Sequence, residues 1–157
     1  MQITRRADYA VRTMMDVAGL GEGATALTRE VASRQLLPAA FLAKIVRSLT
    51  QAGLLRAYRG SGGGITLSRP PEEITLLQVV EAVDGPISVK SCVLWPEECY
   101  RAGGCAVHGV WCEVQRLLVQ HLSGTTVASL VERERVPRPS ECGDEALPYT
   151  VGVESGA

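Results

Sequence analysis

The feature that most constrains the fold is a change of hydrophobic period on either side of Gly53. From residue 38 to residue 49, apolar side chains recur at steps of three and four residues, which is typical of an amphipathic helix. After Gly53, the β-compatible runs 54–58 and 65–67 flank the glycine-rich segment 59–64. We therefore predict a helix that leads directly into a β-hairpin with a glycine-rich tip.

Further helices are predicted on both sides of this unit. Residues 4–20 carry apolar side chains at helical spacing, and residues 28–35 open with Thr28 as a helix start signal. Pro38 suits the first turn of the next helix, so its tight connection to the preceding one makes a helix-turn-helix candidate. Thr75 is expected to cap a fourth helix.

The second half of the chain is organised differently. Residues 86–105 have no hydrophobic period, whereas residues 106–122 carry the long apolar stripe of a single helix, followed by a short helix near Thr126. The last residues are rich in proline, glycine and acids and are expected to form a disordered tail. The predicted units are 1–85, 86–105, 106–136 and 137–157.

Charge is distributed unevenly between these units. Residues 1–69 hold ten Lys and Arg against four Asp and Glu, which is +6, and residues 70–157 hold the remaining six against thirteen, which is −7. A basic half of this kind indicates a polyanion-binding module fused to another function.

Several classes of protein are disfavoured by the same sequence. No stretch approaches the roughly 20 apolar residues of a membrane span and no signal-peptide core is evident, so we expect a cytoplasmic protein without a membrane partner. Neither a phosphate-binding glycine pattern before a helix nor a Ser/His/Asp set is present, so we expect no enzymatic activity and no small-molecule substrate.

Three cysteines and a histidine lie within and just after the non-periodic segment. Cytoplasmic proteins rarely contain structural disulfides, so clustered cysteines suggest metal or redox chemistry. The paired ligand spacing of zinc modules and the common ferredoxin spacings are absent, but three thiolates could hold an iron–sulfur cluster completed by a nitrogen or oxygen ligand. Unrelated buried cysteines and a thiol switch remain alternatives. The residues, spaced C-x6-C-x5-C-x2-H, are Cys92, Cys99, Cys105 and His108.

Helix geometry favours His108 as the fourth ligand. If the long helix begins near Cys105, His108 lies ~4.5 Å further along the axis and Cys112 lies ~10.5 Å further. The first pair could hold one cluster, whereas the second is too far apart. Cys112 is therefore expected to be a small core residue against a partner helix.

Through about residue 136 these features resemble the winged-helix iron–sulfur repressors of the IscR, NsrR and RirA types. The matching pieces are RADYAVR at 6–12, LAKIVRSLTQAGLL at 42–55, the glycine-rich segment 59–64 and the three cysteines. The resemblance implies a mostly α fold: a winged helix-turn-helix domain with a small β-hairpin wing, followed by a long dimerisation helix. It also implies a homodimer on double-stranded operator DNA, with a cysteine-bearing loop that holds the cluster.

The resemblance also bears on the fourth ligand. The pattern His108-x-x-Trp111 matches IscR-type proteins, in which the histidine is a ligand of a 2Fe–2S cluster. In nitric-oxide-sensing relatives an acidic residue from the partner subunit's first helix ligates a 4Fe–4S cluster, and Asp8 stands at the matching place. We expect a 2Fe–2S centre with His108, with Asp8 and a 4Fe–4S centre as the alternative.

Two departures from the family pattern concern the cysteines and the DNA-reading helix. The first cysteine gap is six residues rather than five. Ala40 and Ala43 stand where IscR-type proteins carry polar side chains, so the operator sequence cannot be transferred from those relatives.

The winged-helix resemblance implies a set of DNA contacts. Lys44 and Arg47 are expected to face the major groove or its phosphates, and Arg59 the minor groove, where arginine is favoured if the groove is narrow. The full expected set is Arg5, Arg6, Pro38, Ala39, Lys44, Arg47, Arg59 and Ser61.

The apolar stripe of the long helix is too large for a helix that stands alone, so we expect it to pack between two subunits. Its residues are Val107, Val110, Trp111, Val114, Leu117 and Leu118.

We therefore predict a dimeric transcription regulator, of the repressor type, whose operator binding responds to an iron–sulfur cluster. One alternative is a cluster-free regulator that senses oxidation through the same cysteines. An iron–sulfur or metal carrier without a DNA role is a second alternative, which the basic N-terminal half argues against.

Overall fold

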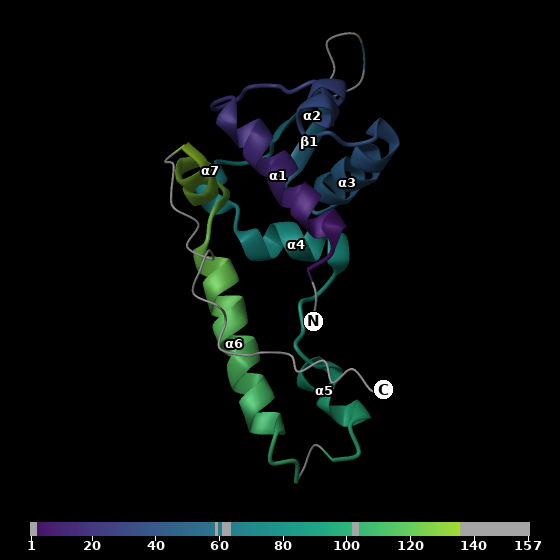
Figure 1. Cartoon of the computed structure of the whole chain (residues 1–157), viewed down its shortest axis with the longest axis vertical. Coiled ribbons are helices and arrows are strands. Elements are labelled where there is room, and N and C mark those ends of the chain that lie inside the picture. The colour runs from purple at the N-terminus through teal and green to yellow at the C-terminus, as the bar shows by residue number, and fades with distance from the viewer. Residues whose placement is uncertain (1–2, 59, 61–63, 102–103, 136–157) are drawn as a thin grey trace, which may run out of the picture.

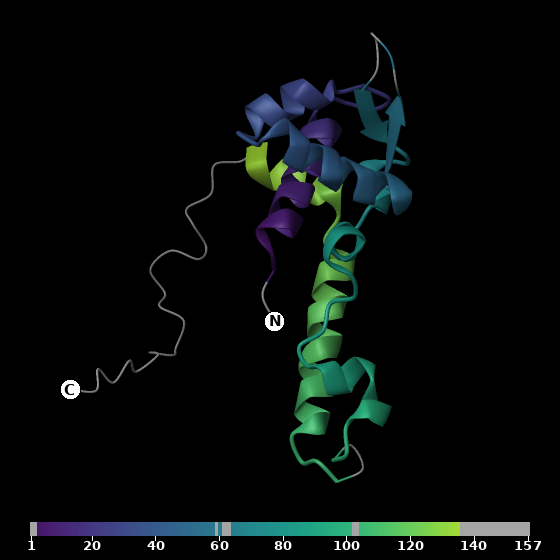
Figure 2. The same cartoon turned by 90° about the vertical axis from the view of Figure 1, so that its right-hand side faces the viewer.

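The computed structural model describes residues 3–58, 60, 64–101 and 104–135. In Figure 1 the first half of the chain and α7 form a helical head, from which α6 descends with α5 beside its far end. Figure 2 shows this arm from the side. The elements in chain order are α1 (Arg5–Gly19), α2 (Thr28–Arg34), α3 (Ala39–Gln51), β1 (Leu55–Tyr58), β2 (Gly64–Leu67), the 3-10 turn η1 (Pro71–Glu73), α4 (Leu76–Asp84), α5 (Ser91–Leu94), the 3-10 turn η2 (Pro96–Glu98), α6 (His108–Gly124) and α7 (Val127–Arg135).

Helix α1 is the centre of the head and packs against α3, α4 and α7. Its buried side chains lie at the three- and four-residue spacing that predicts the helix, and two of them are alanines, which allow neighbouring helices to approach closely. The core of the head is aliphatic, as the low aromatic content indicates. The residues that α1 buries are Ala7, Ala10, Thr13, Met14 and Val17.

Threonine caps fix the ends of α1 and α4. The Thr4 hydroxyl oxygen accepts from the Ala7 N–H at 3.2 Å and the hydroxyl donates to the Asp84 carboxylate at 2.8 Å, which joins the start of α1 to the end of α4. Thr75 forms a capping box with Gln78 at the start of α4, so the predicted cap is confirmed.

The helix-turn-helix is formed by α2 and α3, with one correction to the predicted boundaries. Pro38 has an extended ψ of 130° and is the N-cap residue, one position before the first turn of α3. Helix α2 begins at Thr28, as predicted, with Leu27 as its N-cap residue and its first turn closing on the Leu27 carbonyl. Gly53, with φ of +71°, ends α3 in the left-handed conformation that glycine tolerates.

The predicted hairpin is present as an antiparallel pair, with Leu55 opposite Leu67 and Tyr58 opposite Gly64. An isolated bridge between Ala26 and Ile65 attaches the hairpin to the loop before α2. A Cβ atom at Gly64 would collide with the Ala26 carbonyl oxygen, so this position requires glycine. The mostly α fold with a two-stranded wing is therefore confirmed.

After α6 the chain returns to the head. The Leu76 N–H donates to the Thr125 carbonyl at 2.8 Å, and the Val127 N–H donates to the Ile74 carbonyl at 2.9 Å. These bonds place α7 beside α1 and η1. The expected tail, 137–157, lies outside the described residues. Among the residues that are described, no helix is long and apolar enough to cross a membrane.

Candidate functional site

Helix α3 presents one face to the core and the opposite face to solvent. Leu42, Ile45, Val46 and Leu49 are buried, which fixes the rotation of the helix. The outer face includes the predicted DNA contacts Ala39, Lys44 and Arg47, all of which are exposed, as is Pro38 just before the helix. Within the part of the chain that the structure describes, neither cation has a carboxylate at ion-pair distance.

An ion pair fixes α2 against α1 and so sets the position of the helix-turn-helix. Arg34 contacts the Asp16 carboxylate at 2.9 Å, and the Asp16 side chain is only 7% exposed. These hydrogen bonds raise the pKa of Arg34 above its ordinary value. Gln35 also donates to Asp16, at 3.3 Å.

The wing projects from the head beside α3 (Figure 2). Arg59 and Ser61, which the resemblance assigns to DNA contact, lie outside the described residues. Arg56 and Tyr58 on β1 are exposed on the same hairpin, and Tyr58 is 53% exposed. Sequence reasoning did not name these two residues, although their place at the base of the glycine-rich tip was a signal that could have found them.

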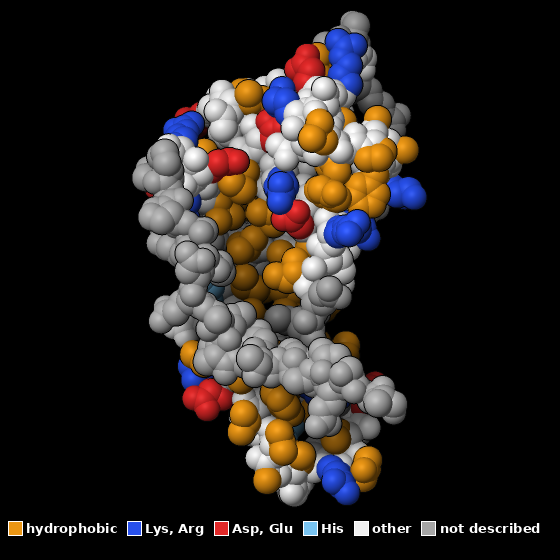
Figure 3. Space-filling view, in the orientation of Figure 1, with side chains coloured by type: hydrophobic (Ala, Val, Ile, Leu, Met, Phe, Trp, Pro, Cys, Tyr) orange, Lys and Arg blue, Asp and Glu red, His pale blue; other side chains and the backbone are white. Residues whose placement is uncertain are grey.

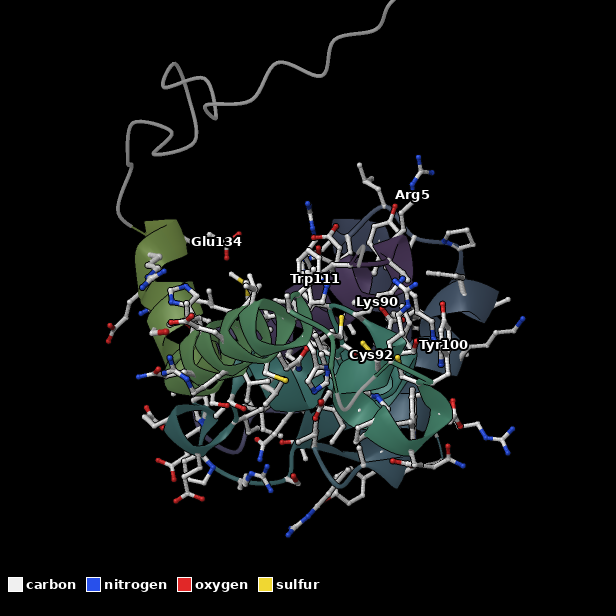
Figure 4. All side chains as sticks on the ribbon, turned by 90° about the horizontal axis from the view of Figure 1, so that it is seen from below. Arg5, Lys90, Cys92, Tyr100, Trp111 and Glu134 are labelled. Atoms are coloured by element: carbon white, nitrogen blue, oxygen red, sulfur yellow. The ribbon has the colours of Figure 1, made fainter. Side chains whose placement is uncertain are left out.

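The two N-terminal arginines have different surroundings. Arg5 is exposed (Figure 4). Arg6 is partly buried, and its guanidinium donates to the Ser48 hydroxyl at 2.6 Å, which joins α1 to α3. Arg6 therefore has a packing role in this structure, whether or not it also meets DNA.

The cysteines are placed in the arm, at the far end from the helix-turn-helix. Cys92 lies in α5, beside α6 (Figure 4), Cys99 follows η2, and Cys105 precedes α6. Together with Cys112 they are free thiols of intermediate exposure. Among the described residues, no three His, Cys, Asp or Glu side chains are close enough to hold one metal ion, so the predicted ligands share a region but do not converge.

Helix α6 does not begin near Cys105, so the predicted helix boundary that favours His108 over Cys112 is wrong. Helix α6 begins at His108, so Cys105 lies outside it and the axial spacing from Cys105 does not apply. Cys112 is one turn after His108, and its Sγ lies 3.5 Å from His108 Nε2. The other ring nitrogen, Nδ1, is buried and has no hydrogen-bond partner within the described residues.

A buried glutamine holds the cysteine-bearing segment to α6. Gln115 accepts from the Val89 N–H at 2.9 Å and donates to the Ile87 carbonyl at 2.8 Å. Its amide thus satisfies two backbone groups of the connection between α4 and α5. The segment 86–105, for which no period was found, contains α5 and η2, both too short to show one.

Asp8, the alternative fourth ligand, is exposed on α1. Its carboxylate pairs with Arg12 at 3.0 Å, one turn further along the same helix. An acidic residue in the first turn also favours the helix dipole.

The predicted dimer stripe divides into two groups. Five of its residues are exposed large hydrophobic side chains, whereas Leu118 is partly buried and packs against the chain's own core. Trp111, which projects from α6, is labelled in Figure 4. Hydrophobic side chains also line the hollow between head and arm in Figure 3. The exposed five are Val107, Val110, Trp111, Val114 and Leu117.

Comparison with known proteins covers both head and arm. A family model described as "Rrf2: Iron-dependent Transcriptional regulator" matches residues 3–133. The HTH-type transcriptional regulator IscR of Aliivibrio salmonicida is 28% identical over 141 residues, which are 90% of this chain and 83% of that protein.

Two solved structures have the same fold. CymR, the global cysteine regulator of B. subtilis, superposes with a TM-score of 0.71 at 23% identity, over 85% of this chain and 98% of that one. IscR of T. potens superposes with a TM-score of 0.68 at 20% identity, over 88% and 94%. With a winged helix-turn-helix head, and with a family match that extends through the arm into α7, this chain belongs to the Rrf2 family of DNA-binding transcriptional regulators.

Proposed function

We propose that this chain is a dimeric regulator whose binding to operator DNA responds to an iron–sulfur cluster at the end of the arm. The observation that carries the proposal is the buried Nδ1 of His108, which has no partner within the described residues. A buried nitrogen without a partner costs about 1–3 kcal/mol. Coordination to iron would satisfy such an atom.

The residues that would hold the cluster are Cys92, Cys99, Cys105 and His108, with Asp8 of a second subunit as the alternative to His108. Thiolates are soft ligands that suit iron–sulfur clusters, and a single imidazole in place of a thiolate raises the reduction potential. The donor set is therefore that of a mixed cysteine–histidine centre, and with His108 as the fourth ligand we propose a 2Fe–2S cluster. If Asp8 of a second subunit is the fourth ligand instead, the proposed cluster is 4Fe–4S.

The arm holds both the proposed cluster ligands and the residues proposed to form the dimer interface. The helix that carries His108 also carries four of the five exposed hydrophobic residues, and the fifth, Val107, is its N-cap residue. These five side chains would pack against a second copy of the chain. A change in the loop before α6 could therefore alter the spacing of the two heads on DNA. As a DNA-binding regulator the protein would act in the cytoplasm.

The cluster is tested on protein purified under nitrogen. We expect a coloured protein with iron and sulfide in comparable amounts, and loss of colour on changing Cys92, Cys99 or Cys105 to Ala. His108→Ala should leave a paler and more labile cluster, whereas Asp8→Ala should change little. The reverse order for those two variants would assign the fourth ligand to Asp8.

A thiol switch is the second candidate, because Cys112 Sγ lies 3.5 Å from a histidine nitrogen and one structural relative is a global cysteine regulator. Protein that stays colourless after anaerobic reconstitution, yet changes its DNA affinity with peroxide, would support this candidate and exclude the cluster.

A further inference from the structure

The outer face of α3 is apolar at its N-terminal end and polar further along the helix. Among its first five residues the fully exposed side chains are the methyl groups of Ala39, Ala40 and Ala43, and every polar side chain follows them. The opposite face is buried in the core, so α3 cannot rotate to present other residues. The polar part of the outer face is Lys44, Arg47, Thr50 and Gln51.

The chemistry of a methyl surface limits what it can read. In helix-turn-helix proteins the N-terminal residues of the second helix contact base edges in the major groove. Alanine has no side-chain hydrogen-bond donor or acceptor, so it cannot make the paired contacts by which Asn, Gln or Arg read purines. The one base feature that a methyl group recognises in the major groove is the 5-methyl group of thymine.

A leucine beside this surface extends its apolar character. Leu36, in the turn before α3, is 90% exposed and has φ of +53°, an uncommon conformation for leucine. The burial of Leu37 and its N–H bond to the Ala32 carbonyl at 2.8 Å hold the turn in this form. The turn therefore presents an apolar side chain next to the start of the outer face.

The cations on the same face indicate that the partner is DNA rather than an apolar protein surface. Lys44 and Arg47 have no carboxylate at ion-pair distance among the residues described, which leaves them available to phosphates. Figure 3 shows hydrophobic side chains over the part of the head that holds α3, with Lys and Arg side chains beside them.

We infer that the outer face of α3 reads thymine methyl groups in each operator half-site through Ala39, Ala40 and Ala43, while Lys44 and Arg47 supply the backbone contacts. The inference rests on the DNA binding that the proposed function includes, but not on the cluster. It assigns operator specificity to A·T pairs at the positions that the first turns of α3 meet.

The test begins with selection of operators from a random duplex pool by the full-length protein. Each thymine of the selected half-site is then replaced by deoxyuridine, which removes only the 5-methyl group. We expect affinity to fall about fourfold for each contacted methyl, the factor for losing one buried methyl-sized group. Thymines outside the α3 contact should show no change.

Three variants assign the effect to α3. In Ala43→Gly the ratio of the affinities for the thymine and uracil operators should fall to one at a single position. Because both affinities are measured on the same variant, any loss of its stability cancels in this ratio. Ala43→Gln keeps high helix propensity and should lower affinity for the selected operator. Ala52→Gly, at an exposed position just past the end of α3, is the matched control and should keep the full ratio.

Two outcomes would overturn the inference. Binding with equal affinity to thymine and uracil operators would exclude methyl recognition and leave the proposed regulator intact. A thymine preference that survives in Ala43→Gly and in the corresponding Ala39 and Ala40 variants would assign the contact elsewhere. Failure to bind any duplex would instead remove the proposed function, and this inference with it.

Discussion

The long helix of the head buries its apolar side chains, whereas the long helix of the arm leaves most of them exposed. Helix α1, with 15 residues, buries five of them in the head, whereas α6, with 17 residues, buries only Gln115 and Leu122. Both helices have an apolar stripe in the sequence, but the stripe of α6 is largely exposed. The same periodicity therefore marks a core inside one chain in the first case and an exposed apolar surface in the second.

The largest expected difference between head and arm is in the free energy of unfolding after matched leucine-to-alanine substitutions. Leu49 is 0% exposed in the head and Leu117 is 53% exposed on the arm. Leu49→Ala should lower the free energy of unfolding by about 2–5 kcal/mol, because it removes buried methyl groups and leaves a cavity. Urea unfolding at several protein concentrations is the measurement. Leu117→Ala should matter only through assembly, so its effect should shrink toward zero as the protein is diluted into the range where it is monomeric, and a concentration-independent loss equal to that of Leu49→Ala would contradict the contrast.

A charge on the exposed stripe tests what covers it. Leu117→Glu should shift the protein from dimer to monomer, because the carboxylate would lose its hydration at the interface. Sedimentation velocity measures the change, and circular dichroism should show a folded head. Leu118→Glu is the contrasting variant: Leu118 packs on the chain's own core, so this change should unfold the protein. A Leu117→Glu protein that remains a dimer would place the interface elsewhere.

The head could be predicted from the sequence in most of its elements, because its signals are local. Helical spacing, the cap at Thr75 and the stop at Gly53 all act within a few residues. The error at Pro38 is a shift of one position, since the exact start of a helix depends on backbone angles that the residue type does not fix.

The arm was harder to predict, because its structure depends on contacts distant in sequence. The hydrogen bonds between the Gln115 amide and the backbone of residues 87 and 89 have no local signature. The start of α6 at His108 also has no signal in the sequence, because its N-cap residue, Val107, has no capping side chain. The spacing of the cysteines in the sequence does not fix their separation in space either, because that separation depends on how α5 packs against α6.

The buried glutamine offers a smaller effect, confined to the arm. Gln115→Met keeps the length of the side chain but removes both hydrogen bonds to the segment before α5. The Val89 amide should then exchange about 10–100-fold faster, which corresponds to about 1–3 kcal/mol of local stability. Hydrogen exchange with residue resolution measures this, with amides of α1 as the internal control. Equal acceleration throughout the head would mean that head and arm unfold together.

The two lysines give the smallest and most selective comparison, because one lies on α3 in the head and the other in the arm. If the dimer neutralises about eight phosphates, log K should fall with log salt at a slope near −7. Lys44→Ala removes one phosphate contact from each subunit, so the slope should become shallower by about 1.8 (~0.9 × 2) with little change in sequence preference. Lys90→Ala removes the same charge from the arm and should leave the slope unchanged, since that end of the molecule lies far from α3 (Figure 1). Fluorescence anisotropy from about 50 to 200 mM salt measures both slopes. Equal changes for the two lysines would mean that the DNA contacts general positive charge rather than the outer face of α3.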